Sequence, residues 1–177
     1  MHCPYLFVVT RKNGEAPLTT EEITDMLPDA DDMFENVDQN VVDYIDGPGS
    51  WNVIVPEYFK EAIEEGLIEV RDNNTFAVKG DIETCKKHMH RLLESAKGEY
   101  DKLAGMMNNF SLMGYSMRNA MNEQNGQRVY AMFDADGAYF SDFSDYTLEE
   151  FLESGMTRKA GGKSEYYQLV AVYDYHC

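Results

Sequence analysis

Short runs of β-branched and aromatic residues predict strands at both ends of the chain and near its middle. Residues 5–10 (YLFVVT) form the first run. Residues 67–70 and 75–78 flank the turn-forming sequence Asp72-Asn73-Asn74, a pattern typical of a hairpin. Residues 166–175 (YYQLVAVYDY) are apolar over most of their length, which favours a central position in a sheet.

Apolar residues spaced by three or four positions predict helices between these strands. One helix begins near Thr20, where a Thr precedes the periodic run, and would bury Ile23, Met26 and Leu27. Another begins at Pro56, a residue favoured in the first turn of a helix, and closes at Gly66.

The C-terminal third of the chain predicts a second hairpin followed by a short helix. Residues 129–133 and 138–140 flank an Asp-Ala-Asp-Gly turn. The helix that follows would be capped by Asp145 or Thr147 and would stop at Gly155.

Residues 81–124 carry the longest regular pattern, with many methionines among its apolar positions. A continuous helix over this range would be ~66 Å long, about twice the width of a small domain. Either it breaks at Gly98, Gly105 or Gly114 into a helical hairpin, or it projects as a dimerising coiled coil. The glycines favour the break.

Together these elements predict an α+β fold with a mostly antiparallel sheet and a long Met-rich helical segment. We expect three regions: an acidic α+β region over 1–80, a long helix or helical hairpin over 81–126, and a β-hairpin-α-β region over 127–177. The last region is expected to share one sheet with the strand at 5–10.

Residues 54–80 (IVPEYFKEAIEEGLIEVRDNNTFAVKG) resemble the end of a winged-helix domain, with a helix, a Gly-Leu-Ile exit and a hairpin wing. Residues 18–27 (LTTEEITDML) would be an earlier helix, giving a winged-helix-like unit over 18–80. DNA-binding winged helices contact phosphates through basic residues. Here the helix carries four glutamates and only one basic residue, Lys60, so the resemblance implies contacts with protein and not with DNA. An alternative hypothesis is therefore a winged-helix-like regulatory protein that dimerises through residues 81–124.

Charge excludes several classes of partner. The chain has 177 residues, with 15 Lys and Arg against 32 Asp and Glu, and a net charge of −17. Direct binding to nucleic acid or to an anionic membrane is therefore not expected. No signal peptide or long apolar run is recognisable, and the 3 cysteines cannot all pair within the chain, so we expect a cytoplasmic protein with reduced thiols.

The acidic residues are concentrated in two stretches. Residues 13–59 and residues 129–157 contain many Asp and Glu but no Lys or Arg, whereas 60–128 is nearly balanced. Protein surfaces ordinarily mix acidic and basic residues. Two long stretches without any basic residue therefore favour a role in binding over an acidic surface that only keeps the protein soluble.

Metal and catalytic motifs are weak. Cys3, Cys85, His88 and Cys177 form the best zinc candidate, yet no CxxC pair supports it, and the preferred interpretation places Cys85 in the core with loose termini. We find no GxSxG sequence, no phosphate-binding loop and no complete calcium loop. The sequence therefore predicts no cofactor and no enzymatic activity, with a zinc-binding module as an alternative.

The preferred hypothesis is a non-enzymatic binding protein that blocks a basic nucleic-acid-binding protein by presenting carboxylates in place of phosphates. In size and acidity the chain is similar to the small antirestriction and anti-CRISPR proteins of phages and mobile elements. The candidate contact residues are two acidic rows and the single tryptophan: Asp29, Asp31, Asp32, Glu35, Asp38, Trp51, Asp134, Asp136, Asp142 and Asp145.

Overall fold

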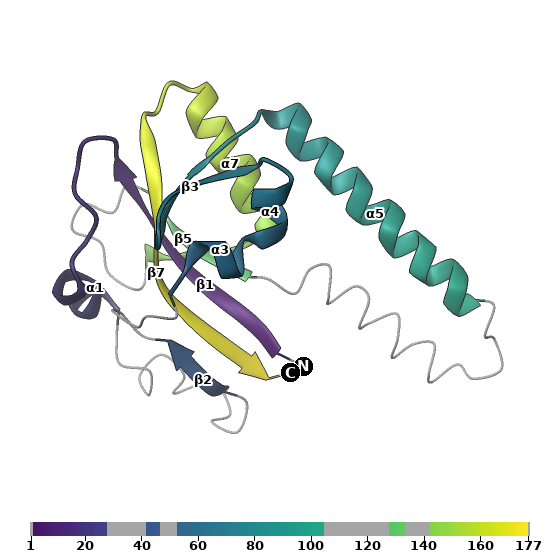
Figure 1. The fold of residues 1–177 in the computed structure, drawn as a ribbon, viewed down its shortest axis with the longest axis horizontal. Helices are drawn as coiled ribbons and strands as arrows, with labels where there is room; N and C mark the ends of the chain where they lie inside the picture. Colours follow the sequence, from purple (N-terminus) through teal and green to yellow (C-terminus); the bar gives the residue numbers. More distant parts are fainter. Residues whose placement is uncertain (1, 28–41, 47–52, 105–127, 134–141, 177) are drawn as a thin grey trace.

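One mixed sheet with helices packed against it forms the body of the molecule, which confirms the predicted α+β fold class (Figure 1). The computed structural model describes residues 2–27, 42–46, 53–104, 128–133 and 142–176.

Two long strands form the centre of the sheet. Strand β1 (His2–Lys12) runs antiparallel to β7 (Glu165–His176) and parallel to the shorter β5 (Arg128–Met132). Strand β6 (Ser144–Thr147) pairs with the other side of β5 and forms one edge of the sheet. The apolar run at 166–175 is therefore a central strand, as its composition indicates.

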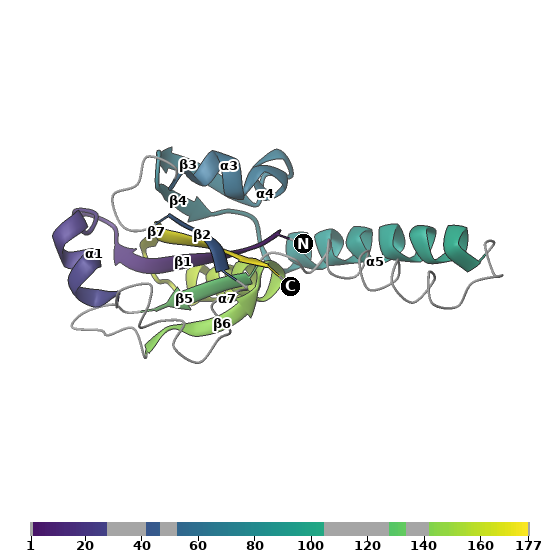
Figure 2. The same ribbon diagram turned by 90° about the horizontal axis from the view of Figure 1, so that it is seen from below.

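The other edge of β7 is shared by two strands. Its first half pairs with β4 (Thr75–Val78), which continues the sheet through a hairpin to β3 (Ile68–Asp72), and its second half pairs with β2 (Val42–Asp46). The strand order is β3-β4-β7-β1-β5-β6, with β2 beside β7. Figure 2 shows this succession from below.

Each face of the sheet covers its own hydrophobic core. The main core contains the rings of Phe59, Phe76, Phe151 and Tyr167. The ring centre of Phe76 lies 4.8 Å from that of Phe59 and 5.5 Å from that of Tyr167, which in turn lies 5.2 Å from that of Phe151. The second core surrounds Phe7, which lies 5.1 Å from the ring of Tyr130 and 5.0 Å from that of Tyr173. Residues of β1 alternate between the two cores, as side chains of a strand must.

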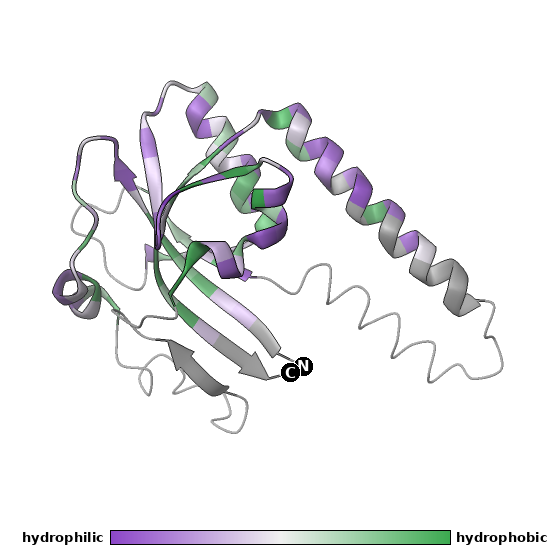
Figure 3. Ribbon diagram, viewed as in Figure 1, coloured by the Kyte–Doolittle hydropathy of each residue, from purple (hydrophilic) through white to green (hydrophobic). Residues whose placement is uncertain are grey.

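Helices cover both faces unequally. The main core is covered by α3 (Val55–Tyr58), α4 (Lys60–Glu64), the first turns of α5 (Ile82–Ala104) and α7 (Leu148–Ala160). The second core receives α1 (Thr20–Met26) through Ile23. Beyond its first turns, α5 extends away from the sheet (Figure 2). The residues of this extended part that carry a hydropathy colour in Figure 3 are mostly hydrophilic.

Helix starts agree with the predicted caps, but two glycines do not act as stops. Thr19 and Thr147 each form a capping box with the Glu three residues later. Helix α7 continues through Gly155 to Ala160, and α5 continues through Gly98. The predicted stop at Gly155 and a break at Gly98 are therefore wrong; Gly105 and Gly114 lie outside the described residues.

The hairpin regions also differ from expectation. Strand β5 pairs with Ser144–Thr147, a polar segment that the sequence pattern does not identify as a strand, whereas 138–140 lies outside the described residues. The hairpin of β3 and β4 is part of the large sheet, because Thr75 and Phe76 pair with β7. A free wing is absent at this hairpin, and the winged-helix-like unit over 18–80 is not confirmed.

Candidate functional site

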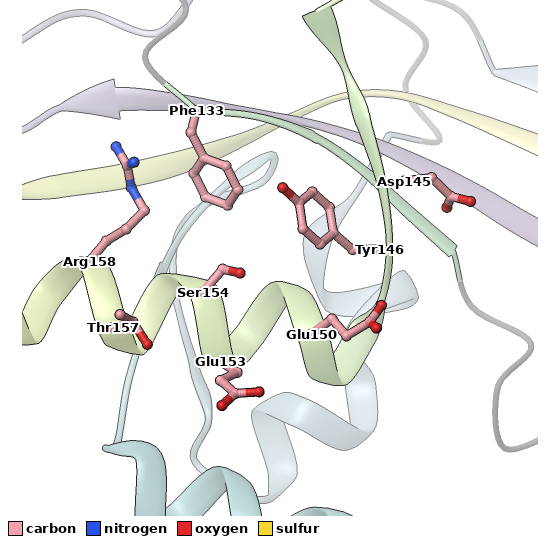
Figure 4. A pocket seen from close by; sticks show the side chains of 8 residues that line it. All are labelled: Phe133, Asp145, Tyr146, Glu150, Glu153, Ser154, Thr157 and Arg158. Carbon is pink, nitrogen blue, oxygen red and sulfur yellow. The ribbon is translucent and has the colours of Figure 1, made fainter.

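A groove lies between α7 and the strands β5 and β6 (Figure 4). Its volume is about 640 Å³. Phe133 follows β5, Tyr146 belongs to β6, and the rings of both point from the sheet toward α7, where Ser154 faces them. The remaining lining residues are charged or polar: Asp145, Glu150, Glu153, Thr157 and Arg158.

The three carboxylates of the groove have different partners. Asp145 accepts a hydrogen bond from Arg128 Nε at 2.9 Å and pairs with the same guanidinium through its second oxygen. Glu150 Oε2 accepts the backbone N–H of Thr147 at 2.8 Å, which closes the capping box. Glu153 is exposed, and within the described part of the chain neither Glu150 nor Glu153 pairs with a basic side chain.

The cationic residue of the lining, Arg158, is held in place by its neighbours. Its guanidinium lies 4.7 Å from the centre of the Phe133 ring and donates to both oxygens of Glu165, at 2.7 and 2.9 Å. Tyr167 donates its hydroxyl to the same carboxylate at 3.0 Å. Burial, together with the charge of Glu165, raises the pKa of Tyr167. Because Glu165 neutralises Arg158, the net charge around the groove is negative.

A second cluster of ionisable groups lies where α5 meets α7. His88 is buried, and its Nδ1 forms a hydrogen bond with Oε2 of Glu65, just after α4. On the other side of the ring, Nε2 lies 3.7 Å from Oε1 of Glu149 in α7. The carboxylate of Glu149, and then that of Glu65, raises the pKa of His88, although burial alone would lower it.

Cys85 lies one turn before His88 and is also buried. Its thiol lies 3.7 Å from the backbone oxygen of Glu149, which it contacts as a weak donor. Burial, with the charges of Glu153 and Glu149, raises the pKa of this thiol. Cys85 is therefore a core residue and a poor nucleophile.

Of the contact residues predicted from the sequence, two can be placed. Asp142 is exposed just before β6, and Asp145 lines the groove. The others lie outside the described residues: Asp29, Asp31, Asp32, Glu35, Asp38, Trp51, Asp134 and Asp136. The sequence pattern does not single out Glu150, Glu153, Phe133 or Tyr146, although the acidic stretch over 129–157, which lacks Lys and Arg, contains all four.

The zinc candidates are not brought together among the described residues. Cys85 and His88 share α5, but β1, with Cys3, begins at the opposite end of the sheet from the start of α5 (Figure 1). Cys177 lies outside the described residues. In the part of the chain that the structure describes, no group of three His, Cys, Asp or Glu side chains has the geometry to hold a metal ion.

The fold and the groove define an α+β protein with an acidic, aromatic-lined surface groove. Comparison with protein-family models, with curated proteins and with solved structures finds no match for this chain. Among the described helices, none combines the length and the apolar character that crossing a membrane requires.

Proposed function

We propose that the protein is a non-enzymatic binding protein whose acidic groove receives basic side chains of a nucleic-acid-binding protein. The observation that supports this is the lining of the groove, in which Glu150 and Glu153 stand beside the rings of Tyr146 and Phe133. Carboxylates attract Lys and Arg, and aromatic faces add cation–π attraction. Arg158 stacked on Phe133 is an example of this second contact within the molecule.

The net charge of −17 extends this attraction beyond the groove. A basic partner would be steered toward the protein before contact, so that carboxylates occupy the surface on which phosphates normally bind. Inhibition of the antirestriction or anti-CRISPR type would follow if the blocked surface belonged to a defence protein.

The groove can be tested with a short peptide of alternating Arg and Gly, followed by NMR titration of the ¹⁵N-labelled full chain. We expect chemical-shift changes in residues 144–158, with an affinity that falls at least tenfold between ~50 and ~300 mM salt because screening weakens ion pairing. Glu153→Lys should weaken binding several-fold. The matched control is Glu94→Lys, which reverses an exposed charge on α5 and should have a smaller effect.

Equal effects of the two charge reversals would show that the peptide responds to net charge only, and would contradict a role for the groove. The competition with nucleic acid needs its own measurement. Partners captured from a lysate would be identified by mass spectrometry and then purified, and the protein should displace a fluorescent DNA or RNA duplex from them. If a captured partner kept its nucleic acid bound in the presence of the protein, the proposal that carboxylates replace phosphates would be wrong.

A further inference from the structure

Helix α5 is attached to the body mainly near its beginning. Cys85 belongs to the main core, and His88, one turn later, has only 3% of its side chain exposed. Five residues beyond His88 the helix is solvent-exposed, since Leu93 is 67% exposed. The contacts of His88 therefore lie in the first turns of α5, and the later turns extend away from the body (Figure 1).

His88 connects three separate elements. It lies on α5, whereas its two carboxylate neighbours are Glu65, at the end of α4, and Glu149, in the first turn of α7. Arg91, one turn along α5, donates to the same oxygen of Glu65 at 2.7 Å. Glu153, also on α7, is exposed, and its charge contributes to the raised pKa of Cys85.

The charges of this cluster balance only when His88 is protonated. An imidazolium carries an N–H on both ring nitrogens, so it donates to Glu65 from Nδ1 and directs a second, charged N–H toward Glu149, 3.7 Å from Nε2. A neutral imidazole has one N–H, and its other nitrogen would present a lone pair to a carboxylate. Glu65, Glu149, Arg91 and His88 then carry one uncompensated negative charge in a largely buried place, which is costly.

We propose that His88 is a proton-dependent joint, which fixes α5 against α4 and α7 when it is protonated and loosens the helix when it loses the proton. The direction of the pH dependence follows from the coupling between proton binding and folding. A histidine whose pKa is raised in the folded protein contributes stability that is complete below its unfolded value of ~6.5 and is lost as the pH rises through the raised value. The helix is thus held at pH values below the raised pKa of His88 and released at pH values above it.

The test follows the ring and the helix in the same protein. Spin labels at Lys97→Cys, on the exposed part of α5, and Lys60→Cys, on α4, would be introduced into a Cys3→Ser/Cys177→Ser chain, in which buried Cys85 stays unlabelled. Electron–electron double resonance should give a narrow distance distribution near pH ~6 that broadens toward pH ~9. The midpoint should match the titration of the His88 ring measured by NMR.

Three variants separate the joint from a general effect of pH. In His88→Gln the distribution should no longer depend on pH, and in Glu149→Gln the midpoint should move to lower pH. His90→Gln, which removes an exposed histidine from the same helix, should keep the wild-type transition. A distribution that stays constant while His88 titrates would overturn the proposal, and so would an unchanged transition in His88→Gln. Should His88→Gln fail to fold, the comparison of midpoints between wild type and Glu149→Gln decides the matter.

Discussion

Gly155 lies where α7 packs so close to the sheet that a side chain would not fit. A Cβ atom at this position would lie 2.8 Å from Cγ2 of Val78 and 3.1 Å from the hydroxyl of Tyr167. Both neighbours belong to the sheet, and Gly155 itself is buried, so nothing nearby moves away easily. The absence of a side chain is therefore what allows α7 to lie close to the sheet.

We expect Gly155→Ala to destabilise the protein by up to ~2 kcal/mol, because overpacking costs ~1–3 kcal/mol and the better helix propensity of Ala offsets ~1 kcal/mol of this. Gly98→Ala is the matched control, since a Cβ at Gly98 in α5 would meet nothing within 4 Å. That variant should be stabilised by up to ~1 kcal/mol. Urea unfolding followed by circular dichroism measures both, and a shift of the same sign in the two variants would refute the packing argument.

The residues of the His88 cluster show what a pattern in the sequence does and does not predict. The apolar spacing correctly places Cys85 in the core, and it puts His88 on the same face of the helix. The partners of His88 cannot be predicted in this way, because Glu65 and Glu149 are 23 and 61 positions away and reach His88 only when α4, α5 and α7 pack together. Local periodicity carries no information about such contacts.

At the scale of elements, α7 depends on its first turn. Thr147 ends β6 and caps α7, and its hydroxyl accepts the N–H of Glu150 at 3.2 Å. The same residue thus sets the direction in which the chain leaves the strand and enters the helix that lines the groove.

Thr147→Ala should lower the free energy of unfolding by ~1 kcal/mol, the usual cost of losing a threonine N-cap. Thr147→Ser keeps an oxygen acceptor and should restore most of this loss. Thermal unfolding of the two variants beside wild type measures the difference. If the Ala and Ser variants were equally unstable, the methyl group of Thr147 rather than its hydroxyl would be the stabilising group.

Elements that are encoded locally could be predicted, and those that depend on distant pairing could not. The caps at Thr19 and Thr147 and the central strand at 166–175 follow from short patterns. Strand β6 has the polar sequence SDYT and exists because it pairs with β5. In the same way, the acidic stretch over 129–157 indicated the region of the groove, but only the orientation of α7 decides that Glu150 and Glu153 line it and that Glu149 faces His88.

At the scale of the whole molecule, the dominant property is the excess of negative charge. With 32 acidic and 15 basic residues, at least half of the carboxylates have no basic side chain to pair with. The ion pairs at the surface, such as Lys79 with Glu69 at 2.8 Å, are largely exposed and contribute little. Repulsion among the remaining carboxylates opposes the compact state.

Moderate salt should therefore stabilise this protein. Raising the ionic strength from ~0.01 to ~0.15 M shortens the screening length from ~30 to ~8 Å, which weakens long-range repulsion more than it weakens pairs in contact. We expect the melting temperature to rise by several degrees, where ~1 kcal/mol corresponds to ~2–4 °C for a chain of this size. The double variant Glu57→Gln/Glu61→Gln, which removes two exposed charges beside the main core, should melt higher at low salt and respond less to added salt. A melting temperature that falls with added salt would mean that attractive ion pairs contribute more to stability than the repulsion among carboxylates costs, and would contradict this prediction.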